Sequence, residues 1–281
     1  GYACYDIGRM HLLGQGCEED EEEAQRWFRD ALEAFQAAEM AAEKKGYLRC
    51  RIGKCHAYGH GAVKVATVLS ELGVTDFAVA TADEAVELRK SGISGNILIL
   101  GKTPVFEREK LVQYDIQQAC DSVEYAKSIV KDGKPAIHIK VDTGMSRLGF
   151  YCHNAEDAEK CAEGILPIYD IEGIKVNGIF THFADADGET DSFTKQQFGA
   201  FLAVTEALTA KGKSVGTRHC CNSAATLRYP EMQLDMVRQG IGLYGLERSA
   251  TGFPFKPAMH VYARIATIGE LSEGDTVSYG R

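Results

Sequence analysis

The sequence lacks the features that direct a protein to a membrane, to secretion or to nucleic acid. No apolar run approaches the roughly 18 residues of a membrane-spanning helix. Residues 1–6 contain neither the basic nor the apolar segment of a secretion signal. The formal net charge is −9, and lysine and arginine form no basic cluster. We therefore expect a cytoplasmic protein that binds neither membranes nor nucleic acid.

The cysteines lack a recognisable pattern. The chain has nine, no pair is separated by two residues, and only Cys220 and Cys221 are adjacent. This spacing fits neither a disulfide scaffold nor a zinc site. We expect reduced, mostly buried thiols and no metal, as is usual in the cytosol.

Residues 1–47 predict a short helical segment that differs from the rest of the chain. Apolar residues recur every three or four positions between Ala24 and Phe35. Residues 8–16 also match residues 53–61 in register. The pattern resembles a Sel-one-like repeat, whose helices need stacked neighbours to bury their apolar faces. A helical-repeat interaction protein is therefore one alternative.

From about Gly61 short apolar strands alternate with helices. Helices are expected at 62–72, at 194–208 and after Thr81, which forms a capping box with Glu84. Strands are expected at 48–52, 77–80, 96–100, 116–120, 137–142, 176–183, 218–222 and 237–244. Such repeated units predict an α/β fold, a (β/α)8 TIM-like barrel over 48–246. Residues 247–281 indicate the start of a β domain, with strands at 259–265 and 275–279.

Five motifs stand out in the barrel region, and they read KCHAYGHG at 54–61, HIKVDTGMSRLGF at 138–150, GIFTHFADAD at 178–187, NSAA at 222–225 and VRQGIGLYG at 237–245. Together they resemble the alanine racemase family, occur in that family's order and extend the resemblance over about residues 54–281. The resemblance implies a pyridoxal 5′-phosphate enzyme that interconverts L- and D-alanine, or serine. Its D-alanine would be a cell-wall precursor, and the complete enzyme would be a homodimer.

The resemblance also gives the site residues their roles. Lys54 forms the Schiff base and exchanges the α-proton. Arg238 donates to the pyridine nitrogen, and His182 holds Arg238 in place. Arg147 contacts the cofactor's phenolic oxygen or the substrate carboxylate, and it is oriented by Lys140, which can be carbamylated in this family.

The phosphate has its own set of residues under the same resemblance. The last strands of a barrel commonly bind phosphate through backbone amides and a helix start. The cofactor-binding residues in this part are Tyr58, Asn222, Ser223, Gly240 and Ile241.

Several residues have a second interpretation. Lys54 aligns with Arg9 of the repeat, where it would be a solvated helix residue, although its spacing from Tyr58 favours the catalytic role. His56 and His60 lie four apart without a matching carboxylate or thiol, which indicates loop polarity rather than a metal site. His219 is interpreted as strand filler beside the site.

Other functions stay open at this point. Another barrel-type pyridoxal-phosphate protein, either a decarboxylase or a cofactor-homeostasis protein, is an alternative, although decarboxylases generally place a carboxylate where Arg238 stands. A chimera without a selected function is a further possibility. The family's second catalytic residue, a tyrosine from the partner's β domain, has no counterpart before Arg281. We therefore expect this chain alone to bind the cofactor poorly and racemise little.

Overall fold

The structure is a computed structural model in which residues 60–130, 133–246, 255–258, 263–265 and 268–276 are described. Lys54, Tyr58, the first predicted strand at 48–52 and the repeat-like segment lie outside these residues. The predicted strands at 259–265 and 275–279 also lie largely outside them, and the described residues after 246 belong to no helix or strand. The boundaries at 47 and 246 therefore stay predictions.

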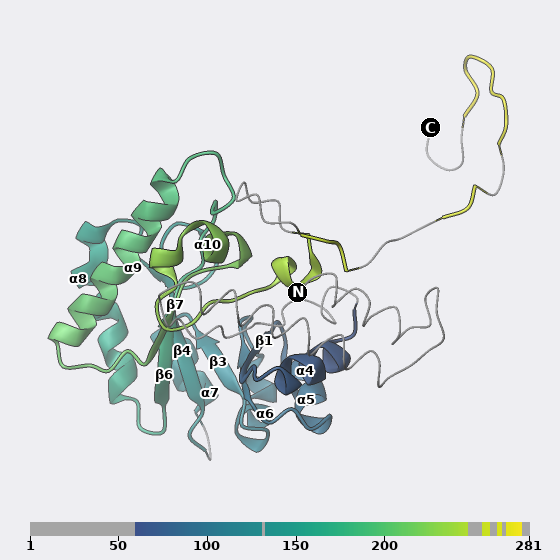
Figure 1. The fold of residues 1–281 in the computed structure, drawn as a ribbon. Helices are drawn as coiled ribbons and strands as arrows, with labels where there is room; N and C mark the ends of the chain where they lie inside the picture. Colours follow the sequence, from purple (N-terminus) through teal and green to yellow (C-terminus); the bar gives the residue numbers. More distant parts are fainter. Residues whose placement is uncertain (1–59, 131–132, 247–254, 259–262, 266–267, 277–281) are drawn as a thin grey trace.

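The core of the fold is a curved, parallel sheet with helices along it (Figure 1). Six of its strands follow one another in the order β1-β2-β3-β4-β6-β7, and every neighbouring pair is parallel. These strands are β1 (Asp76–Val79), β2 (Asn96–Ile99), β3 (Gln117–Cys120), β4 (Ala136–Asp142), β6 (Lys175–Phe180) and β7 (Thr217–His219). A short strand, β5 (Phe150–Tyr151), pairs with the end of β4. The predicted α/β architecture is confirmed.

The predicted strand at 237–244 is wrong. A bridge between His219 and Met236 continues the sheet, the Arg238 amide donates to the Cys221 carbonyl, and Gln239 forms a further isolated bridge. The chain then leaves the sheet and forms the 3-10 helix η5 (Ile241–Tyr244). Gly240, at φ −128° and ψ −102°, turns the backbone away from the strand conformation. The backbone N–H groups of Gly240 and Gly242 donate to the Ser223 hydroxyl, so they do not extend a ladder.

Most predicted helices are present and end where their capping residues require. The Thr81 hydroxyl accepts from the Glu84 amide and the Glu84 carboxylate accepts from the Thr81 amide, which confirms the capping box. Gly73, at φ +85°, follows the first helix in the left-handed region, as expected for a glycine cap. The helices are α4 (Ala62–Glu71), α5 (Ala82–Lys90), α6 (Glu109–Gln113), α7 (Val123–Ile129), α8 (Ala158–Ile165), α9 (Ser192–Ala210) and α10 (Ser223–Arg228).

Short 3-10 helices complete the connections between these elements. They are η1 (Val105–Glu107), η2 (Ala155–Asp157), η3 (Leu166–Asp170) and η4 (Pro230–Met232). In Figure 1, α4 and α5 lie near β1, whereas α8 and α9 lie beside β4 and β6. No helix in the described part of the chain is both long enough and apolar enough to span a membrane.

The interior of the sheet and the helices form one apolar core. On α9, Phe201 and Leu208 are fully buried, while Phe198 and Leu202 of the predicted stripe are half-buried. All five cysteines of the described residues are buried free thiols, which confirms that part of the prediction. Burial raises the pKa of the Cys120 thiol to about 12, so this sulfur is unreactive at neutral pH.

Gly149 gives a direct test of how tightly the loop after β4 packs. It lies at φ +124°, and a Cβ there would meet the Asp142 amide nitrogen at 2.7 Å and the Lys140 carbonyl at 2.8 Å. Gly149→Ala should therefore lower the free energy of unfolding by about 3 kcal/mol, measured by urea denaturation. Gly199→Ala on α9, where a Cβ has open space, should instead raise it by about 0.5–1 kcal/mol. Equal effects of the two changes would contradict this packing.

Candidate functional site

The site is organised around Arg238, which follows the bridge at Met236 and points back into the sheet. Its side chain is 2% exposed. Nη2 donates to the carbonyl oxygens of Thr181 at 2.8 Å and Cys220 at 2.9 Å. Burial lowers the pKa of the guanidinium to about 10, which leaves it charged at neutral pH. A buried charge of this kind requires hydrogen-bond acceptors on every side.

Two histidines supply further contacts to this guanidinium. Arg238 Nη2 lies 3.1 Å from His182 Nδ1, so the residues expected to pair are in contact. Arg238 Nη1 lies 2.8 Å from His219 Nδ1, a contact that the sequence did not predict. His219 is fully buried and stacks on the Phe180 ring with centroids 4.7 Å apart. The interpretation of His219 as strand filler is therefore wrong.

His219 begins a row of hydrogen bonds that crosses the interior of the sheet. We call it the interior network, and it consists of His219, His138, Gln117, Asn96 and Asp76. His219 Nε2 lies 2.8 Å from His138 Nδ1, and His138 Nε2 lies 2.7 Å from Gln117 Oε1. Gln117 Nε2 then donates to Asn96 Oδ1 at 3.2 Å, and Asn96 Nδ2 donates to Asp76 Oδ1 at 3.0 Å.

Physical chemistry fixes the direction of every bond in the interior network. A guanidinium can only donate, so His219 Nδ1 must accept and the proton of His219 lies on Nε2. His138 Nδ1 then accepts, and His138 Nε2 donates to the Gln117 oxygen. The far end is a carboxylate, Asp76, which only accepts. Both histidines are consequently neutral and carry their proton on Nε2.

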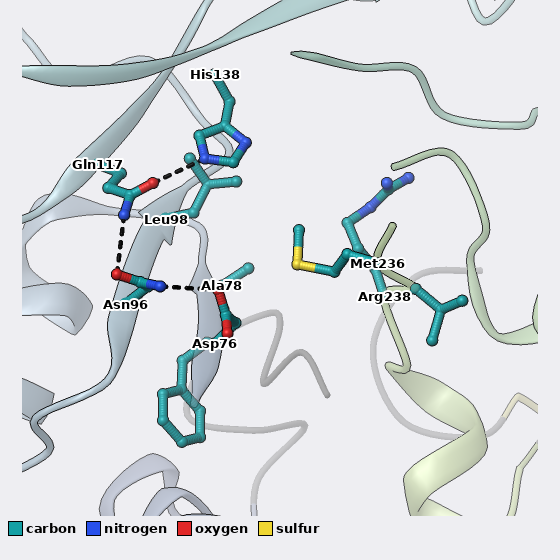
Figure 2. A pocket seen from close by; sticks show the side chains of 10 residues that line it. Asp76, Ala78, Asn96, Leu98, Gln117, His138, Met236 and Arg238 are labelled. Carbon is teal, nitrogen blue, oxygen red and sulfur yellow. Dashed lines mark hydrogen bonds between the residues drawn. The ribbon is translucent and has the colours of Figure 1, made fainter. Parts of the chain in front are cut away.

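Figure 2 shows where the interior network lies relative to Arg238. Asp76, Asn96, Gln117 and His138 form one wall of a cavity inside the sheet, and Met236 and Arg238 form the opposite wall. The cavity therefore lies between the interior network and the segment that carries Arg238.

Gly178 on β6 makes room for the histidine pair. A Cβ at this position would lie 2.4 Å from His138 Nδ1, the atom that contacts His219. Only glycine leaves space for that contact.

Ser223 and the glycine turn after Arg238 form a second part of the site. Ser223 begins α10, and its Oγ accepts from the backbone N–H of Gly240 at 2.9 Å and of Gly242 at 3.1 Å. The amides that bond to Ser223 are thus those of Gly240 and Gly242. Ile241, which lies between them in the sequence, is 37% exposed. Asn222 caps α10, because its Oδ1 accepts from the Ala225 amide at 3.0 Å.

Lys140 and Arg147, which the family pattern expects to act together, lie in different environments. Lys140 is buried, donates to the Val141 carbonyl at 2.8 Å and lies 5.2 Å from the Phe180 ring centre. Arg147 is exposed in the loop between β4 and β5. The structure thus gathers Arg238, His182, Ser223 and the amides of Gly240 and Gly242, and leaves Arg147 at the rim.

Two observations are compatible with the pyridoxal phosphate that the family pattern implies. Nε of Arg238 is buried and has no hydrogen-bond partner among the described residues, so one donor of the buried cation is available for a ring nitrogen. The Gly240 and Gly242 amides both donate to the Ser223 hydroxyl, so three groups of the kind that hydrogen-bond a phosphate lie next to one another.

Sequence reasoning missed His138 and His219, although a signal exists. His138 and Lys140 stand two apart on β4, so both side chains point to the same face of the strand. Gln117 on the buried strand β3 and His219, the buried last residue of β7, are likewise polar. Polar residues at these strand positions, taken together, indicate a hydrogen-bonded layer inside the sheet.

The forced bond directions lead to a prediction for the protein without ligands. His138 and His219 should each carry their proton on Nε2, because a proton on His219 Nδ1 would face an N–H of Arg238. The measurement is ¹⁵N NMR of histidine-labelled protein, which distinguishes the two ring nitrogens of each histidine. A proton on Nδ1 of either residue would contradict the network.

Comparison with known proteins identifies the family. The family described as "Alanine racemase, N-terminal domain" matches residues 36–248, a range that includes Lys54 and Tyr58. Alanine racemase of Clostridium tetani is 40% identical over 246 residues, which are 84% of this chain and 62% of the relative. Alanine racemase 1 of Oceanobacillus iheyensis is 39% identical over 236 residues, 81% of this chain and 61% of the relative.

Solved structures agree with the sequence comparison. Alanine racemase of Clostridium difficile 630 in complex with cycloserine gives a TM-score of 0.73 at 33% identity, covering 81% of this chain and 64% of that one. The Bacillus anthracis alanine racemase with bound L-Ala-P gives a TM-score of 0.71 at 29% identity, covering 82% and 60%. The chain thus spans about three-fifths of the length of its relatives. The chain belongs to the alanine racemase family.

Proposed function

We propose that this chain carries the cofactor-binding half of an alanine racemase that uses pyridoxal 5′-phosphate, with L- and D-alanine as substrates and serine as a second candidate. The observation that carries the proposal is the buried Nε of Arg238, a charged donor without a partner among the described residues. Leaving such a group unsatisfied is costly, so the site is complete only when an acceptor fills it. The pyridine nitrogen of the cofactor is an acceptor of the right kind.

The other contacts to the cofactor are assigned mainly to residues that the fold brings close together. The Ser223 hydroxyl with the amides of Gly240 and Gly242 would hold the phosphate, and Tyr58 and the Ile241 amide are expected to join them. His182 supports Arg238 through its Nδ1 contact. Asn222 contributes indirectly, because it caps the helix that begins with Ser223.

An arginine beside the ring nitrogen also selects the reaction. When bound, the cofactor supplies an electron sink that makes the α-proton of an amino acid removable. Arg238 keeps its own proton, so the ring nitrogen accepts a hydrogen bond and stays unprotonated. The weaker sink favours return of the proton to the α-carbon. This supports racemisation over decarboxylation, for which a carboxylate at this position would be expected.

Exchange of the substrate's α-proton on one face of the α-carbon is assigned to Lys54. Arg147, exposed at the rim of the site, would receive the substrate carboxylate or the phenolic oxygen, and Lys140, buried on β4, would be its carbamylated support. The chain spans about three-fifths of the length of its relatives. The residue that exchanges the proton on the opposite face of the α-carbon is therefore proposed only for the whole protein. That proposal also includes a homodimer in the cytoplasm.

The role of Lys54 predicts a spectroscopic result. Pyridoxal phosphate added to the chain should give the visible absorbance of bound cofactor, and Lys54→Ala should abolish it because the covalent attachment is lost. Lys64→Ala, which changes an exposed lysine of α4, should retain the absorbance of the parent chain. Bands of equal strength in the parent and in Lys54→Ala would remove Lys54 from the mechanism.

A further inference from the structure

Gln197 of α9 is a buried amide whose hydrogen bonds join two loops of the site. Its side chain is fully buried. Its Oε1 accepts from the Ala184 amide at 2.9 Å, and its Nε2 donates to Thr143 Oγ1 at 3.3 Å and to the His182 carbonyl at 3.4 Å. Thr143 follows β4, and His182 and Ala184 follow β6. The amide therefore connects the loop after β4 to the loop after β6.

A second contact extends this connection to Arg238. The hydroxyls of Thr143 and Thr181 lie 2.7 Å apart, and both side chains are fully buried. The backbone carbonyl of Thr181 accepts from Arg238 Nη2 at 2.8 Å. Gln197, Thr143 and Thr181 thus form a continuous hydrogen-bonded path to the guanidinium, which we call the loop bridge.

The other end of the loop bridge leads to Arg147. The Asp142 carboxylate accepts from the backbone amides of Gly144, Met145 and Ser146, which fixes the turn immediately before Arg147. Gly144 lies directly against α9, because a Cβ there would meet the Phe193 ring at 2.9 Å. The turn that presents Arg147 therefore rests on the same helix that carries Gln197.

We propose that Gln197 is a positioning residue that fixes the loop carrying Arg147 relative to the loop carrying His182, and through Thr181 relative to Arg238. The role toward the cofactor rests on the proposed function, whereas the loop bridge itself does not. A buried amide is costly unless its donors and acceptor are bonded. An apolar side chain of similar volume would fill the same space, but it would leave the two loops without a common partner.

The loop bridge is tested by hydrogen–deuterium exchange on the chain without cofactor. Gln197→Met keeps the volume and removes all three hydrogen bonds. We expect exchange to accelerate by about tenfold in residues 143–147 and in residues 182–185, with β1 to β3 unchanged. Thr143→Val, which keeps the shape and removes one hydroxyl, should accelerate the same two segments. Gln196→Met changes the exposed neighbour, whose side-chain amide donates to residues 153 and 154, and it should leave both segments unchanged.

The positioning role is tested by a double-mutant cycle on the dissociation constant of pyridoxal phosphate. Gln197→Met and Arg147→Lys should be non-additive by at least about fivefold, whereas Gln196→Met and Arg147→Lys should be additive. Additive effects in the first cycle would overturn the positioning role. Unchanged exchange in both segments, or faster exchange throughout the sheet, would overturn the loop bridge. Absence of bound cofactor in the parent chain would instead refute the proposed function, and the exchange measurement would still decide the bridge.

Discussion

The structure depends on a guanidinium held inside a sheet. Arg238 is 2% exposed, and its charge survives burial only because acceptors surround it. The acceptors are neutral: two histidine nitrogens and two backbone carbonyls. Neutral partners leave the positive charge uncompensated, so Nε stays a strong donor toward the cavity. The need to satisfy this one group explains why polar side chains occupy strands that would otherwise be apolar.

The interior network and the loop bridge serve the same group from two directions. The interior network runs inward and fixes the proton of His219, so that its Nδ1 always faces Arg238 as an acceptor. The loop bridge runs outward through Thr181 to Gln197 on α9. Together they hold the guanidinium at the junction of β6, β7 and the segment after Met236. The guanidinium is therefore held in place by hydrogen bonds that extend well beyond its immediate neighbours.

The sequence predicted the regular part of the fold because its signals are local. The Thr81–Glu84 capping box, the Gly73 cap and six of the strands are set by short stretches of residues. The error at 237–244 has a non-local cause, since the amides of Gly240 and Gly242 bond to Ser223, about 17 residues earlier in the chain. Within the site, His182, Ser223 and Arg238 could be placed together because the resemblance to the family assigns all three to one cofactor. His138 and His219 could not, because they meet across 81 residues through sheet register.

Under the proposed function, Arg238 donates to the ring nitrogen of pyridoxal phosphate and leaves that nitrogen unprotonated. The most direct measurement is ¹⁵N NMR of the protein loaded with pyridoxal phosphate labelled at the ring nitrogen. We expect an unprotonated, hydrogen-bonded nitrogen in the native chain and a protonated nitrogen in Arg238→Glu, where a carboxylate replaces the donor. A protonated ring nitrogen in the native chain would contradict it.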